Sequence, residues 1–205
     1  MAGKDYSMVE GVVVAEHQPL ASSAYRAPVE RGGTKKPWLK DRLVGEQQGA
    51  DDELDFDGPN PFGERALDIY GQAVGQIESG NRYEITGGYN NHYQGRYQMG
   101  RDALADVGVG FTTADREAFL ADPDAQDAAF RAFTLQNHAT LSRLSRRYRE
   151  MSRTEQLGIL GYAHNQGAGG ALDYLRTNKD TADGFGTLGS KYINAVKTAF
   201  QGGEA

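Results

Sequence analysis

Residues 66–80 read Ala-Leu-Asp-Ile-Tyr-Gly-Gln-Ala-Val-Gly-Gln-Ile-Glu-Ser-Gly, and their apolar spacing decides how the folded domain begins. The large apolar side chains recur at intervals of three and four residues, at Leu67, Tyr70, Val74 and Ile77. This spacing gathers them on one face of a helix. Gly80 favours an end at that point, because glycine readily adopts the left-handed conformation of helix C-termini. The stretch therefore predicts an amphipathic helix with Glu78 in its last turn.

The pattern beyond this stretch predicts more helices around a small sheet. Residues 83–98 are rich in aromatic residues and contain Gly87-Gly88 and Asn90-Asn91, which favours an irregular β-hairpin. Helices are expected near 100–107, 114–121, 124–149, 153–165, 169–176 and 187–200. Asp122-Pro123-Asp124 is a start signal for the long helix, and Ser152 with Glu155 forms a capping box for the next. The expected fold class is therefore α+β and mostly helical.

Residues 1–60 differ in composition from the rest of the chain. Their apolar pieces are short and sparse, such as Val12-Val13-Val14 and Trp38-Leu39, and an acidic run covers residues 51–57. Such a segment cannot bury enough apolar surface to offset its own ordering entropy. We therefore expect an extended N-terminal arm over residues 1–60 that docks on a partner, followed by one domain over residues 61–205.

The composition argues against several classes of protein. The chain has 205 residues, a formal net charge of −6 and no cysteine. Residues 1–60 hold 7 basic and 11 acidic groups and the rest hold 15 and 17, so neither part has the basic excess of a nucleic-acid-binding domain. No apolar run approaches the length of a membrane span, and residues 1–16 lack the apolar core of a secretory signal. A basic cluster either faces an anionic polymer or is a solvated helix face; its members are Arg143, Arg146, Arg147, Arg149 and Arg153.

Three short motifs follow one another along the domain. They are Glu78-Ser79, then Gly95-Arg96-Tyr97-Gln98-Met99, then Tyr162-Ala163-His164-Asn165-Gln166-Gly167. In this order they resemble the motifs of lytic transglycosylases and goose-type lysozymes, and the resemblance extends from about Ala66 to Phe200. The variant Tyr93-x-Gly95-Arg96-Tyr97-Gln98 is similar to the lysozyme-like domains of bacteriophage virions. The chain departs from the family in its Tyr-, Asn- and Gly-rich segment before Gly95 and in His164, where the family has tyrosine.

The resemblance implies a lysozyme-like fold that cleaves the β-1,4 bond between MurNAc and GlcNAc, with Glu78 as the single general acid and base. A glycosidic oxygen leaves only when it is protonated, and apolar surroundings such as Val74 and Ile77 favour a protonated carboxyl group. Most glycosidases use a second carboxylate, but no residue matches a family position for one among Glu84, Asp102 and Asp106. We therefore expect the C6 hydroxyl of the substrate to attack and a 1,6-anhydro sugar to form. A hydrolytic lysozyme is the alternative, with Glu84 as the first candidate for the second carboxylate.

The later two motifs are expected to bind substrate. The resemblance implies that Gln98 lies in the sugar groove and Asn165 near the acid, and both amides can donate and accept hydrogen bonds. Aromatic rings suit the apolar faces of sugars; the other expected binding residues are Tyr93, Tyr97, Met99, Tyr162 and His164. Alternatively, Gln98 bonds its own turn, Asn165 caps a helix, and the tyrosines belong to the core. The histidines lack metal-ligand spacing and there is no cysteine, so neither a metal nor a cofactor is expected.

The expected function is a peptidoglycan-degrading lytic transglycosylase of a phage virion that acts during DNA entry. Without a secretory signal, such an enzyme reaches the periplasm or cell wall as a tail or internal component of the particle, or as a lysin released through a holin. The expected partners are peptidoglycan and, through residues 1–60, other virion proteins, with no nucleic acid and no membrane span. An alternative from another class is a structural or adaptor virion protein whose lysozyme-like domain does not cut.

Overall fold

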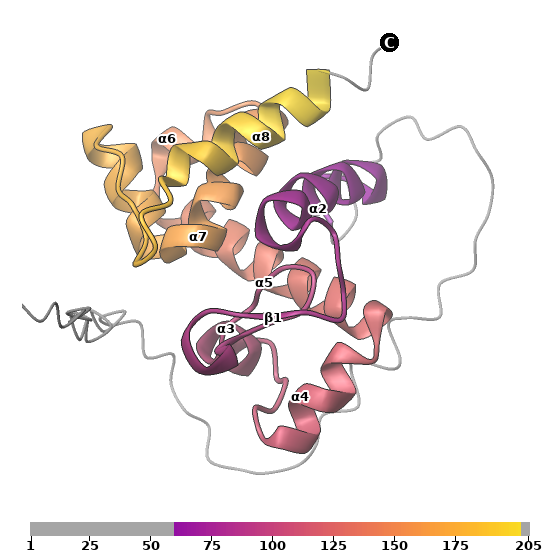
Figure 1. The fold of residues 1–205 in the computed structure, drawn as a ribbon. Helices are drawn as coiled ribbons and strands as arrows, with labels where there is room; N and C mark the ends of the chain where they lie inside the picture. Colours follow the sequence, from indigo (N-terminus) through magenta and orange to yellow (C-terminus); the bar gives the residue numbers. More distant parts are fainter. Residues whose placement is uncertain (1–59, 202–205) are drawn as a thin grey trace, which may run out of the picture.

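The computed structural model describes residues 60–201 (Figure 1). The expected arm lies outside the described residues apart from Asn60, as do residues 202–205. The elements are α2 (Glu64–Ser79), β1 (Thr86–Gly87), η1 (Tyr89–Asn91), β2 (Tyr93–Gln94), α3 (Arg101–Asp106), α4 (Thr113–Leu120), α5 (Pro123–Leu144), α6 (Arg146–Arg149), α7 (Arg153–Thr177) and α8 (Gly189–Gln201). A mostly helical architecture with a small antiparallel sheet is thus confirmed.

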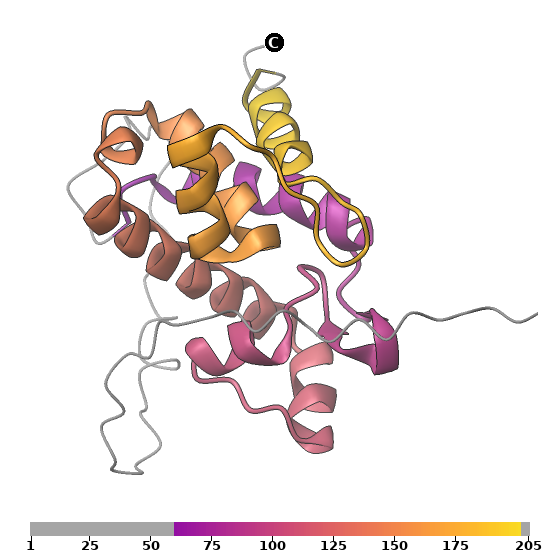
Figure 2. The same cartoon turned by 90° about the vertical axis from the view of Figure 1, so that its left-hand side faces the viewer.

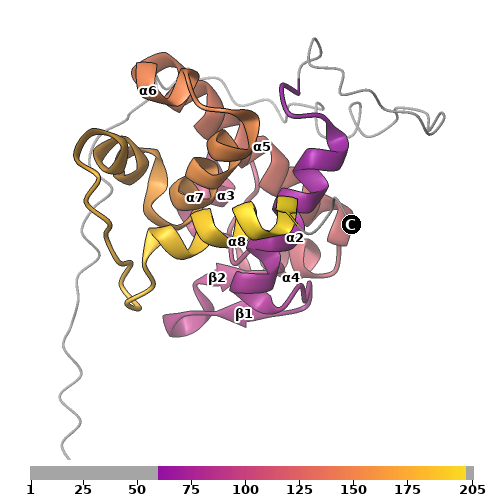
Figure 3. The same ribbon diagram turned by 90° about the horizontal axis from the view of Figure 1, so that it is seen from above.

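Helix α5 runs between two groups of elements (Figures 1 and 2). Helices α2, α7 and α8 pack against one another on one side of it, while the hairpin, α3 and α4 lie on the other side. Viewed from above, the α7–α8 connection lies beside the hairpin (Figure 3). The end of α2 and the middle of α7 therefore meet the hairpin where the two groups adjoin.

Helix α2 forms as the apolar spacing predicted. Leu67, Tyr70 and Val74 are buried, and each such side chain contributes roughly 1.5–3 kcal/mol through removal from water. The helix ends where Gly80 adopts a left-handed conformation (φ 64°), and its N–H donates to the carbonyls of Gln76 and Gly75. This end fixes Glu78 in the last turn.

The long helix begins as expected but ends earlier. The Asp122 side chain accepts a hydrogen bond from the Ala125 N–H at 3.0 Å, and Pro123 occupies the first turn. The predicted range of 124–149 is wrong at its C-terminal end, because Ser145 is extended (φ −128°, ψ 112°) and caps the separate helix α6. A serine hydroxyl that bonds the backbone in this way competes with the continuing helix.

Helix α7 begins at the predicted capping box. The Ser152 hydroxyl accepts from the Glu155 N–H, and the Glu155 carboxylate accepts from the Ser152 N–H at 2.9 Å. Two helices were predicted over 153–165 and 169–176; the structure has one element that is interrupted only at Gly167 (φ 73°, ψ 165°). The interruption lies two residues after Asn165.

The hairpin is short and irregular, as predicted. Strands β1 and β2 are antiparallel, with Thr86 opposite Gln94 and Gly87 opposite Tyr93. A further bridge joins Gln94 to Met99 and closes the turn that carries the second motif. The motif residues between Gly95 and Met99 are therefore part of a tight turn.

The basic cluster is used for local contacts around α6. Arg146 pairs with Glu150 at 2.6 Å, Arg147 donates to the Leu175 carbonyl at 2.6 Å, and Arg149 donates to the Ser142 carbonyl at 2.5 Å. These bonds tie α6 to its neighbours. Among residues 60–201, no helix is both long and apolar enough to cross a bilayer.

Candidate active site

Glu78 lies where α2, α7 and α8 meet. Its side chain is 18% exposed, and its Oε1 accepts a hydrogen bond from the Tyr192 hydroxyl of α8 at 2.7 Å. His164 of α7 places its Nε2 3.2 Å from the same oxygen. The carboxyl group is therefore held by two side chains and is mostly shielded from bulk water.

Tyr192 is a site residue that the sequence analysis missed. Burial raises the pKa of its phenol well above the usual range, and the negative charge of Glu78 adds to this rise. The hydroxyl therefore keeps its proton and donates to Glu78 at any physiological pH. Tyr192 is 114 positions from Glu78 along the chain, and its sequence context signals only an apolar helix position.

His164 contacts Glu78 through a nitrogen that must carry a proton. Its Nε2 hydrogen-bonds the carbonyl oxygen of Tyr97 at 2.9 Å, which can only accept, and lies 3.2 Å from Glu78 Oε1. Its Nδ1 is buried without a partner, where a second proton would be an unsatisfied donor. The geometry thus assigns the proton to Nε2. Edge-on contact with the Phe130 ring keeps the imidazole, which is 6% exposed, in this position.

Ser79 joins the end of α2 to the hairpin turn. Its hydroxyl donates to the Arg96 carbonyl at 2.7 Å and accepts from the Arg82 N–H at 3.0 Å. The residue after the acid thus fixes the turn that carries the second motif. In the family-like pair Glu78-Ser79, the serine has a structural task at the base of the site.

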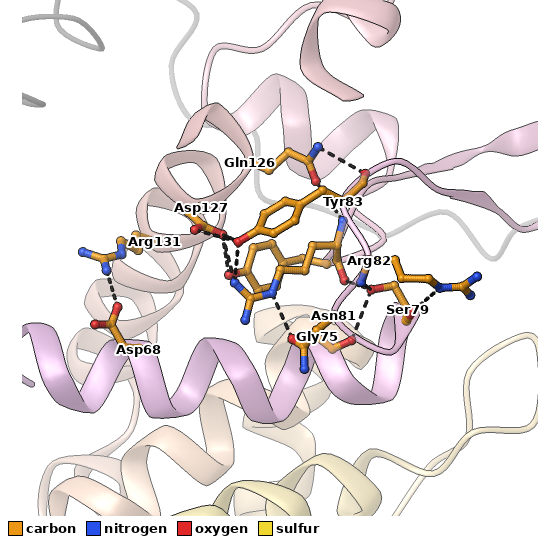
Figure 4. Close-up of polar contacts among 11 residues, drawn as sticks. Asp68, Gly75, Ser79, Asn81, Arg82, Tyr83, Gln126, Asp127 and Arg131 are labelled. Carbon is orange, nitrogen blue, oxygen red and sulfur yellow. Dashed lines mark hydrogen bonds and ion pairs between the residues drawn. The ribbon is translucent and has the colours of Figure 1, made fainter. Parts of the chain in front are cut away.

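The Arg96 side chain also secures this turn, and its partners Asn81, Tyr83 and Asp127 are labelled in Figure 4. Its Nε donates to Asn81 at 2.9 Å and its Nη1 donates to the Tyr83 hydroxyl at 2.7 Å and to Asp127 at 3.4 Å. Tyr97 also donates to Asp127, at 2.7 Å. The network connects α2, the hairpin and α5, so the second motif is built into the frame of the domain.

Gln98 bonds its own turn in this structure. Its backbone has a positive φ of 45°, and its Nε2 donates to the Gly95 carbonyl at 2.8 Å. The side chains of Tyr97 and Met99 are 4% and 2% exposed and lie in the core, where Tyr97 stacks on Phe130 at 3.8 Å. Of these three expected binding residues, Gln98 alone keeps a partly exposed side chain.

Asn165 contacts two residues that lie close to Glu78. Its Nδ2 donates to Asp183 Oδ2 at 2.8 Å, and its amide also hydrogen-bonds the Tyr192 hydroxyl, which partly offsets the rise in the phenol's pKa. A continuous set of contacts therefore runs from Asp183 through Asn165 and Tyr192 to Glu78. Gly167 interrupts α7 two residues after Asn165, so Asn165 lies in the last helical turn before the break.

The tyrosines of the expected binding set separate into two kinds. Tyr93 is partly exposed, and its ring lies 6.2 Å from Phe185, two residues after Asp183, whose carboxylate accepts a hydrogen bond from Asn165. Tyr162 is 0% exposed, stacks on Tyr174 and shares a hydrogen bond with Thr181 at 2.8 Å. Tyr93 therefore borders the site, whereas Tyr162 supports it from below.

Asp183 is the acidic residue that the fold adds near the site. Glu84 and Asp102 are exposed residues for which no contact with Glu78 is present, and the pKa of Asp106 is raised by burial and by Asp102 rather than by Glu78. Asp183 lies in the α7–α8 connection, which carries no family motif, so sequence reasoning had no signal for it. Within residues 60–201, no group of three or more His, Cys, Asp or Glu side chains could hold a metal ion.

Two hollows of the described surface lie away from Glu78. One, of about 420 Å³, is lined by Ser152, Thr154, Glu155, Lys197, Phe200 and Gln201. The other, of about 110 Å³, lies between α2 and α5, beside Arg96 and Asp127. Neither hollow includes Glu78.

Comparison of the chain with protein-family models, with curated proteins and with solved structures gave no match. The function of the site has to be inferred from its own geometry and from the motifs.

Proposed function

We propose that the domain is lysozyme-like and acts as a lytic transglycosylase that cleaves the MurNAc–GlcNAc bond of peptidoglycan, with Glu78 as its only general acid and base. The proposal rests on the observation that, among residues 60–201, neighbouring side chains contact only one oxygen of the Glu78 carboxyl group. Tyr192 and His164 both approach Oε1 of Glu78. Because the Tyr192 hydroxyl donates to Oε1, the proton of the neutral acid belongs on Oε2, where it can be given to a substrate.

The reaction then needs no group beyond Glu78 and the substrate. Glu78 Oε2 gives its proton to the glycosidic oxygen, and the bond between C1 of MurNAc and this oxygen breaks. The C6 hydroxyl of the same sugar attacks C1, and its proton passes to Oε2 and restores the acid. The products are a shortened strand with a free hydroxyl and a 1,6-anhydro sugar, and no water is consumed. General acid and base catalysis of this kind contributes roughly 10²–10⁴-fold to the rate.

The neighbouring residues hold the acid for this step. Tyr192 stabilises the carboxylate after the first proton transfer, because a hydrogen bond to a charged acceptor is stronger than one to a neutral acceptor. Asn165 fixes the Tyr192 hydroxyl, and Asp183 fixes Asn165. Tyr93 offers a ring and a hydroxyl to the sugar beside the acid.

A hydrolytic lysozyme is the second candidate, and Asp183 is the observation that favours it. A carboxylate near the acid can activate water. However, Asp183 Oδ1 accepts the N–H groups of Phe185 and Thr187, at 2.9 and 2.8 Å, and Oδ2 accepts from Asn165. Both oxygens of Asp183 therefore accept hydrogen bonds that position the α7–α8 connection and Asn165. A carboxylate used in this way is less able to activate water, which favours the transglycosylase. Asp183→Asn should therefore leave the anhydro product unchanged; a change from hydrated to anhydro products in this variant would identify a hydrolase.

The setting is part of the same proposal. A phage virion component that acts in the periplasm or cell wall fits the sequence, with residues 1–60 as the segment that contacts other virion proteins. The support is the sparse apolar content of these residues and the similarity of the second motif to virion lysozyme-like domains. Deletion of residues 1–60 should abolish incorporation into particles without abolishing cleavage.

The deciding experiment compares the full chain with Glu78→Gln on purified peptidoglycan. The wild type should clear a zymogram and release fragments that contain 1,6-anhydro-MurNAc, whereas the variant should do neither while its circular dichroism spectrum is unchanged. Products heavier by one water would identify the lysozyme. Clearing by Glu78→Gln, or absence of clearing by the wild type, would overturn the proposal and favour an adaptor protein.

A further inference from the structure

Aromatic rings continue from the Glu78 site across the surface of the hairpin. The ring of Tyr93 lies 6.2 Å from Phe185 of the α7–α8 connection and 5.0 Å from His92. The ring of His92 in turn lies 6.0 Å from Phe111, in the segment between α3 and α4. Tyr93, His92 and Phe111 thus form a row of rings, called the ring row below. A disaccharide can bridge the span from Tyr93 to Phe111.

Two arginines flank the far end of this row. The guanidinium carbons of Arg101 and Arg116 lie 5.3 and 5.4 Å from the centre of the Phe111 ring. Neither arginine has a carboxylate within 4.0 Å among residues 60–201. Arg116 also has a buried Nε without an acceptor. Both cations therefore keep hydrogen-bonding capacity that the described protein does not use.

The acidic neighbours of these arginines are occupied or solvated. Asp115 precedes Arg116, but its carboxylate accepts the N–H and hydroxyl of Thr112 at 2.9 and 2.7 Å, and these bonds lower its pKa. Asp102 follows Arg101 and is exposed. The ring row therefore ends in two positive charges over an aromatic face.

We propose that Arg101, Phe111 and Arg116 form an anion subsite that binds a carboxylate of the peptide attached to the glycan strand. The inference rests on the proposed function, because the ring row starts beside Glu78. Sugar rings of the strand are uncharged, whereas the peptide on MurNAc carries free carboxylates. A guanidinium that lies on an aromatic face binds a carboxylate with planar, directional hydrogen bonds. Phe111 fixes both cations at one place through cation–π contacts.

A binding experiment with the full-length Glu78→Gln variant tests this subsite without cleavage. The probes are soluble glycan strands that carry their peptides and the same strands after an amidase has removed the peptides, which leaves only the lactyl carboxylate on each MurNAc. The parent variant should bind the peptide-bearing strands about tenfold more tightly, as expected for one charge-assisted contact. Adding Arg101→Gln and Arg116→Gln should remove this preference and leave the affinity for stripped strands within about twofold. Arg146→Gln, on the exposed side of α6, is the matched control and should change neither affinity.

Other outcomes contradict the subsite. Equal weakening on both kinds of strand would assign the arginines to the glycan or to folding, and unchanged binding to both would show that the arginines do not contact the polymer. Either result leaves the proposed function standing if the wild type still clears peptidoglycan. If the wild type does not clear peptidoglycan, the proposed function fails, whereas loss of a measured preference for peptide-bearing strands would still support the subsite.

Discussion

The helical side of the site and the hairpin turn use their motif residues in different ways. On the helical side, Glu78, His164 and Asn165 come together through contacts that span large sequence distances. In the turn, Tyr97 and Met99 are buried, and Gln98 bonds Gly95. The first region gathers the polar side chains of the candidate site, whereas the side chains of the second region stabilise the turn itself. Residues that share a family-like motif can thus be needed for opposite reasons, and the two regions should respond differently to substitution.

The largest expected effect lies in the turn, at Gly95. Its φ is +73°, and a Cβ at this position would lie 2.0 Å from Oε1 of the buried Gln126. Gly95→Ala should lower the free energy of unfolding by roughly 2–4 kcal/mol, through the left-handed backbone and the overpacking together. Thermal denaturation measures this loss. The control is Gly169→Ala in α7, where nothing lies within 4 Å of the added methyl group and stability should hold or rise slightly. If the two variants lose the same free energy of unfolding, the turn at Gly95 does not require glycine.

On the helical side, Tyr192→Phe should affect activity more than stability. It removes the donor to Glu78 Oε1 and keeps the buried ring. A hydrogen bond to a charged group is worth about 1.5–3 kcal/mol, so kcat should fall roughly 10- to 100-fold. Steady-state kinetics on soluble glycan strands checks this, with KM nearly constant. A rise in KM at constant kcat would mean that Tyr192 binds sugar instead of holding the acid.

The sequence contained much of the frame of the domain. Periodicity located α2, the signals at Asp122 and at Ser152 located the starts of α5 and α7, and turn residues located the hairpin. These features are local, so a single stretch of chain contains the physical cause. The break at Ser145 was missed because a serine in a long polar helix has the same local pattern whether or not its hydroxyl caps a new helix.

The site was only partly accessible to sequence reasoning. Glu78, His164 and Asn165 lie in motifs that the sequence shows, and the structure brings them close together. Tyr192 and Asp183 come from segments without a motif, and tertiary packing alone brings them to the acid. Tyr97 and Tyr162 show the opposite error, because aromatic residues in a motif suggest a sugar surface whereas burial assigns them to the core.

Tyr97→Phe is the counterpart of Tyr192→Phe in the turn. It removes a phenol donor to Asp127, which still accepts hydrogen bonds from Tyr83 and Arg96. Because Asp127 keeps these partners, the unfolding free energy should fall by only about 0.5–1.5 kcal/mol, and kcat should stay within about threefold of the wild type, a change of less than about 1 kcal/mol. Chemical denaturation and the same kinetic assay measure the two quantities. A large loss of kcat with normal stability would mean that Tyr97 takes part in the reaction. The helical side and the hairpin turn would then not differ in the way described above.

The smallest effect is expected at the start of α7, remote from both regions, and it has a distinctive pH dependence. The Ser152 hydroxyl and backbone lower the pKa of Glu155. A carboxylate whose pKa is lowered in the folded state stabilises the fold at any pH above its pKa in the unfolded chain, which is ~4.3 for glutamate. This stabilisation is lost as the pH falls through the pKa of the folded state. Ser152→Ala should therefore cost about 1 kcal/mol or less at neutral pH, through the cap and the carboxylate bond. The difference between the variant and the wild type in the free energy of unfolding, measured by urea denaturation, should become smaller below about pH 4. The kcat at neutral pH should be unchanged. If the difference in unfolding free energy stays constant down to low pH, the Ser152 hydroxyl acts only as a helix cap and the Glu155 charge does not contribute.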